Sequence, residues 1–325
     1  MNSRQRFLEC MRFGTPDRPP CFQEGLRDDV LEKWRGQGMP AGTKLDQLFY
    51  YDQREEVSLD LYSRLDPVDL AGKPLGLERW KRSLDPADEH RLPPGWKKDL
   101  DRWRERQHVL MVQVHPGFFE TLGIGESRSF TRALYLIVDQ PVFVRSAMAI
   151  HGEFAARLLE RFLKEVQVDA AVFSEPIAGN HGPLISPRTY SDLVLPTYQP
   201  VLDVLSSYGV ETVILRTYAN ARVLLPVVLQ AGFNCLWAVE TEPDAMDYRA
   251  IRQEFGRELR LIGGIDVDVL RQGEQSVRSE IEGKVRPLLA QGGYIPLADG
   301  RVRSDMPFEN YRFYRQYLES TVRGF

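Results

Sequence analysis

The sequence predicts an α/β fold: a TIM (β/α)8 barrel with an N-terminal helical extension and an elaborated early excursion. From position 109 onward, short apolar runs alternate with helical patterns, which is typical of a parallel sheet with helical crossovers. The length of 325 residues suits one barrel or two smaller domains, and we expect one barrel domain over 1–325. An open doubly wound sheet is the second choice, because no glycine-rich phosphate-binding turn follows any predicted strand.

Each element follows from a local pattern. Residues 3–13 place Phe7, Leu8 and Met11 at helical spacing, and Gly14 ends this helix. Residues 26–106 are rich in charge, Gly and Pro, so we predict an irregular excursion that covers the barrel mouth and contains the eighth strand. The other strands are expected at 20–24, 109–115, 170–175, 212–217, 235–240, 259–266 and 293–299, and the later helices at 154–166, 201–208, 224–231, 248–255, 277–289 and 311–318.

The composition excludes several classes of protein. The chain has 42 Lys and Arg against 46 Asp and Glu, so it has no basic surplus with which to bind nucleic acid. Cys10, Cys21 and Cys235 are widely spaced, which argues against a disulfide framework and favours the reducing cytoplasm. No window is apolar enough to span a membrane, and the N-terminus does not resemble a signal peptide. We expect a cytoplasmic enzyme with a small-molecule substrate. The sequence leaves open whether the enzyme is a homodimer.

Ionisable residues end almost every predicted strand. In a barrel these ends surround one mouth, so we expect the following residues to converge there: Glu24, His115, Glu175, Arg216, Glu240, Asp266 and Asp299. The loop after Glu175 adds Asn180 and His181, and Tyr218 follows Arg216. Each residue also has a structural alternative: Asp266 as a helix cap, for example, and His115 as a turn residue before Pro-Gly.

Five motifs in order resemble the uroporphyrinogen decarboxylase superfamily. They are RQRFLECMRFGTPDRPP, NHGPLISPRTY, LIGGID, GGYIP and FENYRFY. The resemblance covers nearly the whole chain and implies a TIM barrel with a deep cleft at the carboxyl ends of its strands. It also implies one of two chemistries: cofactor-free decarboxylation of a tetrapyrrole's acetate arms, or methyl transfer to or from a corrinoid, usually with zinc.

The chain departs from both branches of that superfamily. The decarboxylases carry RQAGRY after the first strand, whereas this chain reads FQEGLRDD, with Glu24 where a cation is wanted. Like-charge repulsion with a polyacidic substrate disfavours the heme-pathway reaction. The methyltransferases carry H-x-C and a later Cys, whereas this chain has Arg216, Tyr218 and Asp299. A guanidinium does not ligate metal, so we expect no zinc; a metal held by Glu175, His181 and Asp299 is the alternative.

The resemblance therefore implies a corrinoid-linked, methyltransferase-like enzyme that demethylates a small O- or N-methylated substrate. A partner protein would supply the corrinoid (cobalamin), because the chain shows no cobalamin-binding module. The expected catalytic residues are Asp299, Glu175 and His181, and the expected substrate-binding residues are Glu24, His115, Asn180, Arg216, Tyr218, Glu240 and Asp266. Two alternatives stay open: a cofactor-free decarboxylase (a lyase) in which Arg216 binds the substrate carboxylate, and a barrel that only binds a ligand.

Overall fold

The computed structural model describes residues 1–124, 127–241 and 243–325. These residues form two compact units. The first unit comprises Met1–Arg54, Gln107–Val109 and Cys235–Phe325, and the second comprises Glu55–Arg106 and Leu110–Asn234. The expectation of one domain over 1–325 stays a prediction, as does the expectation that residues 26–106 cover the barrel mouth.

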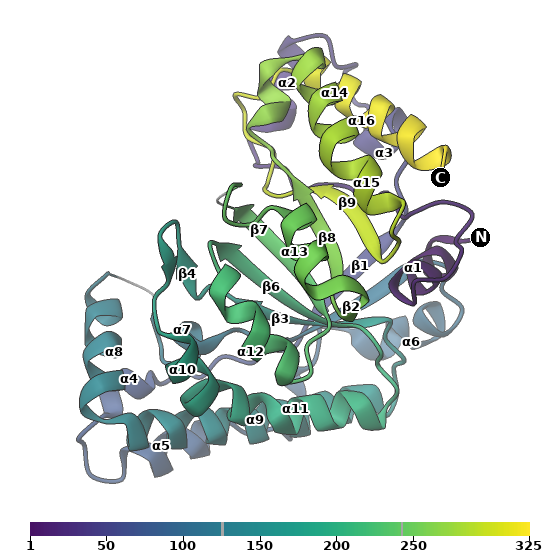
Figure 1. Cartoon of the computed structure of the whole chain (residues 1–325). Coiled ribbons are helices and arrows are strands. Elements are labelled where there is room, and N and C mark those ends of the chain that lie inside the picture. The colour runs from purple at the N-terminus through teal and green to yellow at the C-terminus, as the bar shows by residue number, and fades with distance from the viewer. Residues whose placement is uncertain (125–126, 242) are drawn as a thin grey trace. The chain divides into compact units, whose positions relative to one another are not determined.

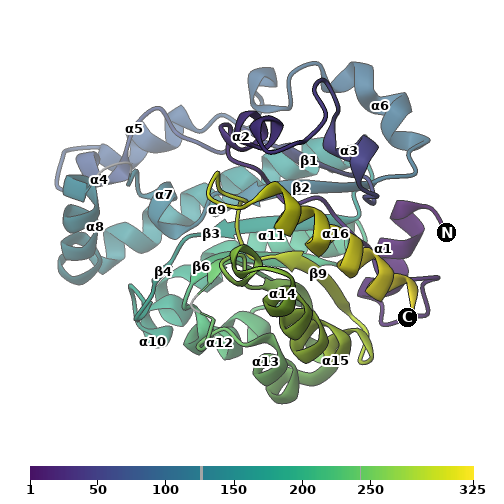
Figure 2. The same cartoon turned by 90° about the horizontal axis from the view of Figure 1, so that it is seen from above.

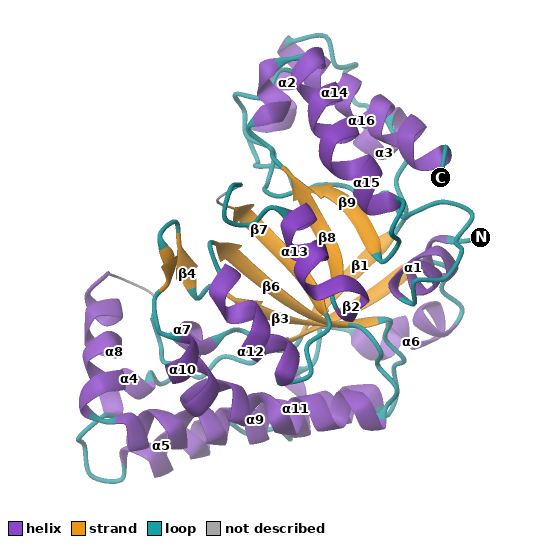
Figure 3. Ribbon diagram, viewed as in Figure 1, coloured by secondary structure: helices purple, strands orange, loops and turns teal. Residues whose placement is uncertain are grey.

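The second unit holds four neighbouring strands of the main sheet, in the order β1-β2-β3-β6. The pairings β2–β3 and β3–β6 are parallel, as expected for strands joined by helices. A short antiparallel hairpin, β4–β5, follows β3. The strands are β1 (Arg54–Ser58), β2 (Val109–His115), β3 (Ala170–Glu175), β4 (Ala178–Gly179), β5 (Gly182–Pro183) and β6 (Val213–Ala219), as seen in Figures 1 and 3.

Helices cover one face of these strands. Two of them, α9 and α11, lie side by side (Figure 1). A Cβ atom on Gly152 of α9 would lie 2.0 Å from the carbonyl oxygen of Thr197 on α11, so this close packing needs a glycine. The helices are α4 (Pro67–Leu70), α5 (Gly76–Ser83), α6 (Trp96–Arg104), α7 (Phe118–Thr121), α8 (Ser127–Asp139), α9 (Pro141–Leu163), α10 (Pro187–Thr189), α11 (Leu195–Ser207) and α12 (Leu225–Gln230).

The first unit contains three neighbouring parallel strands in the order β7-β8-β9. They are β7 (Cys235–Thr241), β8 (Arg260–Ile265) and β9 (Tyr294–Ala298). Figure 2 shows the helices α13, α14 and α15 of this unit from a second direction. Its helices are α1 (Ser3–Met11), α2 (Val30–Gly36), α3 (Leu45–Leu48), α13 (Tyr248–Phe255), α14 (Glu274–Glu280), α15 (Arg286–Leu289) and α16 (Phe308–Arg323).

The main sheet differs from the predicted closed barrel in one strand. Seven of the described strands belong to it, and neither β1 nor β9 has a second neighbour, so the sheet is not closed. The strand expected at 20–24 is wrong: this segment is extended and makes only one isolated parallel bridge, between Leu26 and Val302. The strand expected inside the irregular excursion is present as β1. The fold is therefore of the α/β, TIM-barrel kind without closure.

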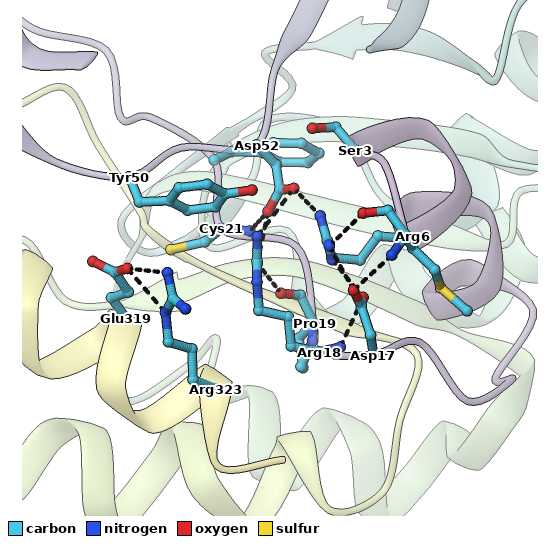
Figure 4. Close-up of polar contacts among 12 residues, drawn as sticks. Ser3, Arg6, Asp17, Arg18, Pro19, Cys21, Tyr50, Asp52, Glu319 and Arg323 are labelled. Atoms are coloured by element: carbon cyan, nitrogen blue, oxygen red, sulfur yellow. Dashed lines mark hydrogen bonds and ion pairs between the residues drawn. The ribbon is translucent and has the colours of Figure 1, made fainter. Parts of the chain in front are cut away.

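The N-terminal motif of the first unit surrounds one buried carboxylate (Figure 4). Asp52 accepts hydrogen bonds from Arg6 at 2.5 Å, from Arg18 at 2.8 Å and from the Cys21 amide at 2.8 Å. All three charged side chains are buried. Two guanidinium groups on one carboxylate leave an excess positive charge. Asp17 balances it by pairing with Arg6 at 2.7 Å. The motif therefore fixes the chain before and after residues 20–24.

No single helix in the described residues is both long and apolar enough to cross a membrane. Only Phe130–Asp139 and Pro141–Leu163 taken together, across a bend of 111°, reach the necessary length and composition.

Candidate functional site

One face of the second unit's sheet is polar. It carries, from β1, β2, β3 and β6, the side chains of Glu56, Ser58, Gln113, Ser174, Arg216 and Tyr218, which we call the polar face. Ser174 lies opposite Arg216 in the strand register, and Ser58 donates a hydrogen bond to Gln113 at 3.3 Å. None of the six is fully buried. A strand that is buried on both faces is normally apolar throughout, so these polar residues indicate a site rather than packing.

Arg216 and Glu56 form a two-pronged ion pair across this face. The Nη1 and Nη2 atoms of Arg216 lie 2.8 and 2.5 Å from the two carboxylate oxygens of Glu56. The strands that carry them, β6 and β1, are separated in the sheet by β2 and β3. Both side chains remain partly accessible, at 16% and 25%. The predicted substrate-binding cation therefore already holds a carboxylate in the fork geometry that guanidinium groups favour.

A register shift turns His115 away from the polar face. Gln113 pairs with Val172, but His115 pairs with Phe173, because the ladder shifts between Gln113 and His115. Neighbouring residues of a strand point to opposite faces, and a bulge of this kind redirects the side chains that follow it. His115 consequently stacks on Phe173 and contacts Tyr198 of α11. It lies among the helices and not beside Arg216.

His115 and His151 form a buried hydrogen-bonded chain. The Gly117 amide donates to His115 Nδ1 at 3.0 Å, so the proton of a neutral His115 ring sits on Nε2 and points to His151 Nδ1, 3.1 Å away. His151 then carries its own proton on Nε2, which donates to the Leu61 carbonyl at 2.9 Å. Burial lowers the pKa of His115 well below its usual value and that of His151 to about 4. Both rings are neutral near pH 7.

Glu175 lies on the same helix-facing side and is also fully buried. Its carboxylate accepts hydrogen bonds from the Tyr198 hydroxyl at 2.5 Å, the Phe118 amide at 3.0 Å and the Tyr190 hydroxyl at 3.1 Å. Tyr190 begins a π-helical turn (Tyr190–Val194), a feature that often redirects side chains. Desolvation raises the pKa of Glu175 to about 7, although its three donors act in the opposite direction.

Asn180 and His181 form the turn of the β4–β5 hairpin, and both are exposed. The hairpin contacts the end of β6 through a hydrogen bond from the Asn220 amide to the Gly179 carbonyl at 3.2 Å. Tyr218 is half-buried near that end of β6, on the polar face. The hairpin therefore lies near the carboxyl end of β6, but its two polar side chains face solvent.

In the first unit, Glu24 is the centre of a second buried network. Its carboxylate lies 2.9 Å from the guanidinium of Arg315 on α16. The hydroxyls of Tyr314 and Tyr311 donate to it at 2.7 and 2.9 Å. A cavity of about 290 Å³ adjoins this network and is lined also by Asp52 and Arg54. The charge of Glu24 is thus neutralised by Arg315 of α16, which removes the objection that Glu24 would repel an anionic substrate.

The remaining predicted carboxylates hold loops of the first unit. Asp299 is buried; Oδ2 accepts from the Thr241 hydroxyl at 2.5 Å and its amide at 3.1 Å, while Oδ1 accepts from the Val267 amide at 3.1 Å. Burial raises the pKa of Asp299, against these donors. Asp266 makes a local turn by accepting from the Asp268 amide at 2.8 Å. Glu240 is exposed and pairs loosely with Arg27 at 3.9 Å.

Positive backbone φ angles mark two of these strand ends. Ala219 at the end of β6 has φ +51°, and Glu240 near the end of β7 has φ +46°. Such angles are uncommon for residues other than glycine, and backbone strain of this kind concentrates at functional sites. Packing explains why glycines occupy positions 263 and 264. A Cβ on Gly264 would lie 2.6 Å from the ring of Tyr248, so the glycines accommodate packing.

Zinc does not fit the residues at the positions of the superfamily's H-x-C ligands. Arg216 and Tyr218 stand there, and Arg216 is occupied by Glu56. Across residues 1–124, 127–241 and 243–325, no group of three or more His, Cys, Asp and Glu side chains is arranged to hold a metal ion. Both carboxylate oxygens of Glu175 and of Asp299 already accept protein hydrogen bonds.

Within the second unit, the structure thus brings Arg216 and Tyr218 together on one face and places His115 and Glu175 on the other. Sequence reasoning missed Glu56, Gln113 and Ser174 on the polar face, and His151, Tyr190 and Tyr198 on the helix side. One signal was present for Gln113 and Ser174: each is a polar residue inside a strand that otherwise reads as apolar. No local signal identifies His151, which lies within a long helix.

The comparisons with known proteins agree with this architecture. The sequence profile named "Uroporphyrinogen decarboxylase (URO-D)" matches residues 122–319, more than half of the chain. The chain therefore belongs to the uroporphyrinogen decarboxylase family. The solved structure of a methyltransferase from Methanosarcina mazei is similar, with a TM-score of 0.60 and 15% sequence identity over 98% of this chain and 99% of that chain. At this identity the likeness shows a shared fold. No curated protein matches the sequence.

Proposed function

We propose that this member of the family is a methyltransferase that moves a methyl group between a small O- or N-methylated compound and a corrinoid held by a partner protein. The polar face carries the proposal: Arg216, Glu56 and Tyr218 lie together, partly accessible, where the family's methyltransferases place their metal ligands. The fold shared with a methyltransferase supports this branch. The corrinoid would supply the group that accepts or donates the methyl.

The chain's own residues would orient the substrate and manage its proton. Demethylation of an ether or amine requires that the leaving oxygen or nitrogen be protonated or hydrogen-bonded as the methyl departs. The Tyr218 hydroxyl is the proton donor that we assign, because both Glu175 and Asp299 are enclosed by protein donors. Arg216 would bind an acceptor atom of the substrate. Glu175 is then a positioning residue, Asp299 stabilises loops of the first unit through Thr241 and Val267, and the exposed His181 contributes from the hairpin.

Methyl transfer with defined components tests the proposal. The purified chain is incubated with methylcobalamin, or with a reduced corrinoid protein and small methyl ethers and methylamines, and the corrinoid absorbance is followed. We expect turnover that falls on the order of a hundredfold in Arg216→Gln and in Tyr218→Phe. His181→Ala measures separately what the hairpin contributes. Turnover that survives both substitutions on the polar face would contradict the assigned site, and no methyl transfer to or from any corrinoid would contradict the function.

Decarboxylation is the second candidate, and one observation favours it. Arg216 already grips a carboxylate, that of Glu56, with both terminal nitrogens. A substrate carboxylate that replaced Glu56 would meet the same geometry. Carbon dioxide release from a panel of small carboxylic acids, measured without any corrinoid, identifies this reaction. Release that depends on Arg216 and needs no corrinoid would replace the methyl-transfer proposal.

A further inference from the structure

The second unit contains a small cavity that the proposed function does not use. Its volume is about 50 Å³, and residues of the early excursion and of α7 and α9 line it. In this measure a water needs about 10–15 Å³, so the cavity holds roughly three to five water-sized groups. Its walls are mixed. Leu61, Leu65, Trp80 and Pro116 supply apolar surface, and polar atoms come from the other lining residues: Tyr62, Ser63, Asp66, Glu120, Thr121 and His151.

One wall group lacks the partner that it needs. The side chain of Trp80 is fully buried, and its indole Nε1–H has no hydrogen-bond partner among the described residues. Leaving such a donor unpaired destabilises the folded state, because the N–H group gives up its hydrogen bond to water without gaining another. Two other buried indoles are paired: Trp34 donates to the Met306 carbonyl at 2.7 Å and Trp103 to Glu55 at 3.1 Å. The exception lies at a cavity.

The neighbouring ring cannot supply that partner. His151 stacks on Trp80, with ring centroids 6.4 Å apart and an angle of 18° between the planes. Both of its nitrogens are occupied, one by His115 and the other by the Leu61 carbonyl. Acceptors for a guest's own proton do exist at the cavity, because the carboxyl groups of Asp66 and Glu120 also line it.

We infer that this cavity binds a small hydroxyl compound, the size of methanol to propanol. Its oxygen accepts from the indole N–H of Trp80 and its proton goes to the Asp66 carboxylate, while its alkyl group packs on Leu61 and Leu65. The two carboxyl groups disfavour anions, and an ammonium ion has no lone pair for the indole. A cluster of waters is the competing occupant, because the walls also offer polar partners, and titration with alcohols distinguishes the two.

Nuclear magnetic resonance of the full chain tests this inference without any activity measurement. The chain has five tryptophans, so ¹⁵N labelling gives five indole N–H resonances, and Trp80→Phe identifies that of Trp80. Titration with methanol and ethanol should shift the Trp80 resonance along a saturating curve. tert-Butanol, which has a branched alkyl group, should not. The resonances of Trp34 and Trp103, whose N–H groups are paired, serve as internal controls.

Two variants make the result decisive. Leu65→Phe fills the cavity but keeps the indole, and it should abolish the saturating shift while the Trp80 resonance persists. Trp103→Phe removes a paired indole outside the cavity and should leave the titration unchanged. A linear drift shared by all five resonances, or a saturating shift that survives in Leu65→Phe, would overturn the inference. A Trp80 resonance that none of the alcohols moves would mean that only water occupies the cavity, which overturns it as well.

Discussion

At the scale of single residues, the pairing of Arg216 with Glu56 controls what the polar face can bind. A guanidinium whose two terminal nitrogens already hold a carboxylate presents little free charge to a ligand. A ligand with its own carboxylate must therefore compete with Glu56, whereas a neutral methylated compound need not. The pair thus favours neutral substrates in the form of the protein described here.

We predict that Glu56→Gln binds small carboxylates such as acetate about tenfold more tightly than the parent chain, or about 1.4 kcal/mol. The stability should change by less than about 1 kcal/mol, because partly exposed ion pairs contribute little. Calorimetric titration and urea unfolding measure the two quantities. Glu55→Gln is the matched control, since Glu55 pairs with Arg102 and not with Arg216. Equal carboxylate affinity in both variants would show that Glu56 does not block Arg216.

Asp299 gives a second residue-scale prediction. Its two oxygens both face N–H donors, so the amide group of Asp299→Asn must set an NH₂ against one of them. We predict a loss of about 1–3 kcal/mol in unfolding free energy, measured with urea. Asp266→Asn should lower the unfolding free energy by less, because the Asp266 side chain accepts a single hydrogen bond among the described residues, from the Asp268 amide. Unchanged stability in Asp299→Asn together with lost turnover would instead favour a catalytic role.

At the scale of elements, the order and type of the later strands could be predicted from the sequence, but the directions of their side chains could not. The runs at 109–115 and 170–175 are strands with the expected bounds. The register shift after Gln113 leaves no mark in the sequence, yet it decides that His115 faces helices. Side chains along a strand point alternately to the two faces of the sheet. The prediction that all strand-end residues converge at one mouth assumed that the last side chain of every strand points to the same face.

The helix-facing cluster of Glu175, His115 and His151 makes the stability depend on pH in two opposite ways. The folded state holds a proton on Glu175 up to about pH 7, whereas an unfolded Glu releases it near 4.5. Stability from this group therefore falls as the pH rises from 4.5 to 7. His151 has a folded pKa of about 4 against 6.5 unfolded, so its contribution is lost as the pH falls from 6.5 toward 4.

We predict that Glu175→Gln removes the first trend and leaves the second. The difference in unfolding free energy between the parent chain and this variant should change by roughly 3 kcal/mol between pH 4.5 and 7, in favour of the variant at the higher pH. Urea unfolding at half-unit pH steps measures it. His151→Gln should show the reverse change below pH 6.5. A parallel pair of curves for Glu175→Gln would mean that Glu175 titrates normally.

At the scale of the whole chain, the absence of the strand predicted at 20–24 also has a physical reason. Residues 20–24 had the apolar and turn residues of a strand, but tertiary contacts direct their backbone elsewhere: the Cys21 amide bonds to the Asp52 side chain, and the Cys21 carbonyl accepts from the Asp52 amide at 2.9 Å. Strand β1 lay hidden because its sequence, REEVS, is charged. Its polar side chains belong to the candidate site, which is where local sequence rules are expected to fail.

We predict that Asp52→Asn destabilises the chain by about 3–5 kcal/mol, because it removes the buried counter-charge of Arg18 and one of the two carboxylates paired with Arg6. Urea unfolding of the parent chain and of the variant measures this difference in unfolding free energy. Asp17→Asn is the control: its side chain is 42% exposed, so its loss should cost no more than about 1 kcal/mol. Equal effects of the two substitutions would show that Asp52 is not the centre of the network.

The first unit joins the two ends of the chain, and this sets an order of events during synthesis. Glu24 and Arg315 are 291 positions apart, so the N-terminal segment leaves the ribosome about 15–60 s before its partner helix, at typical rates of elongation. The residues of the second unit are complete once Asn234 has been made. A nascent chain can therefore complete the polar face before Arg315, the cation that pairs with Glu24, has been made.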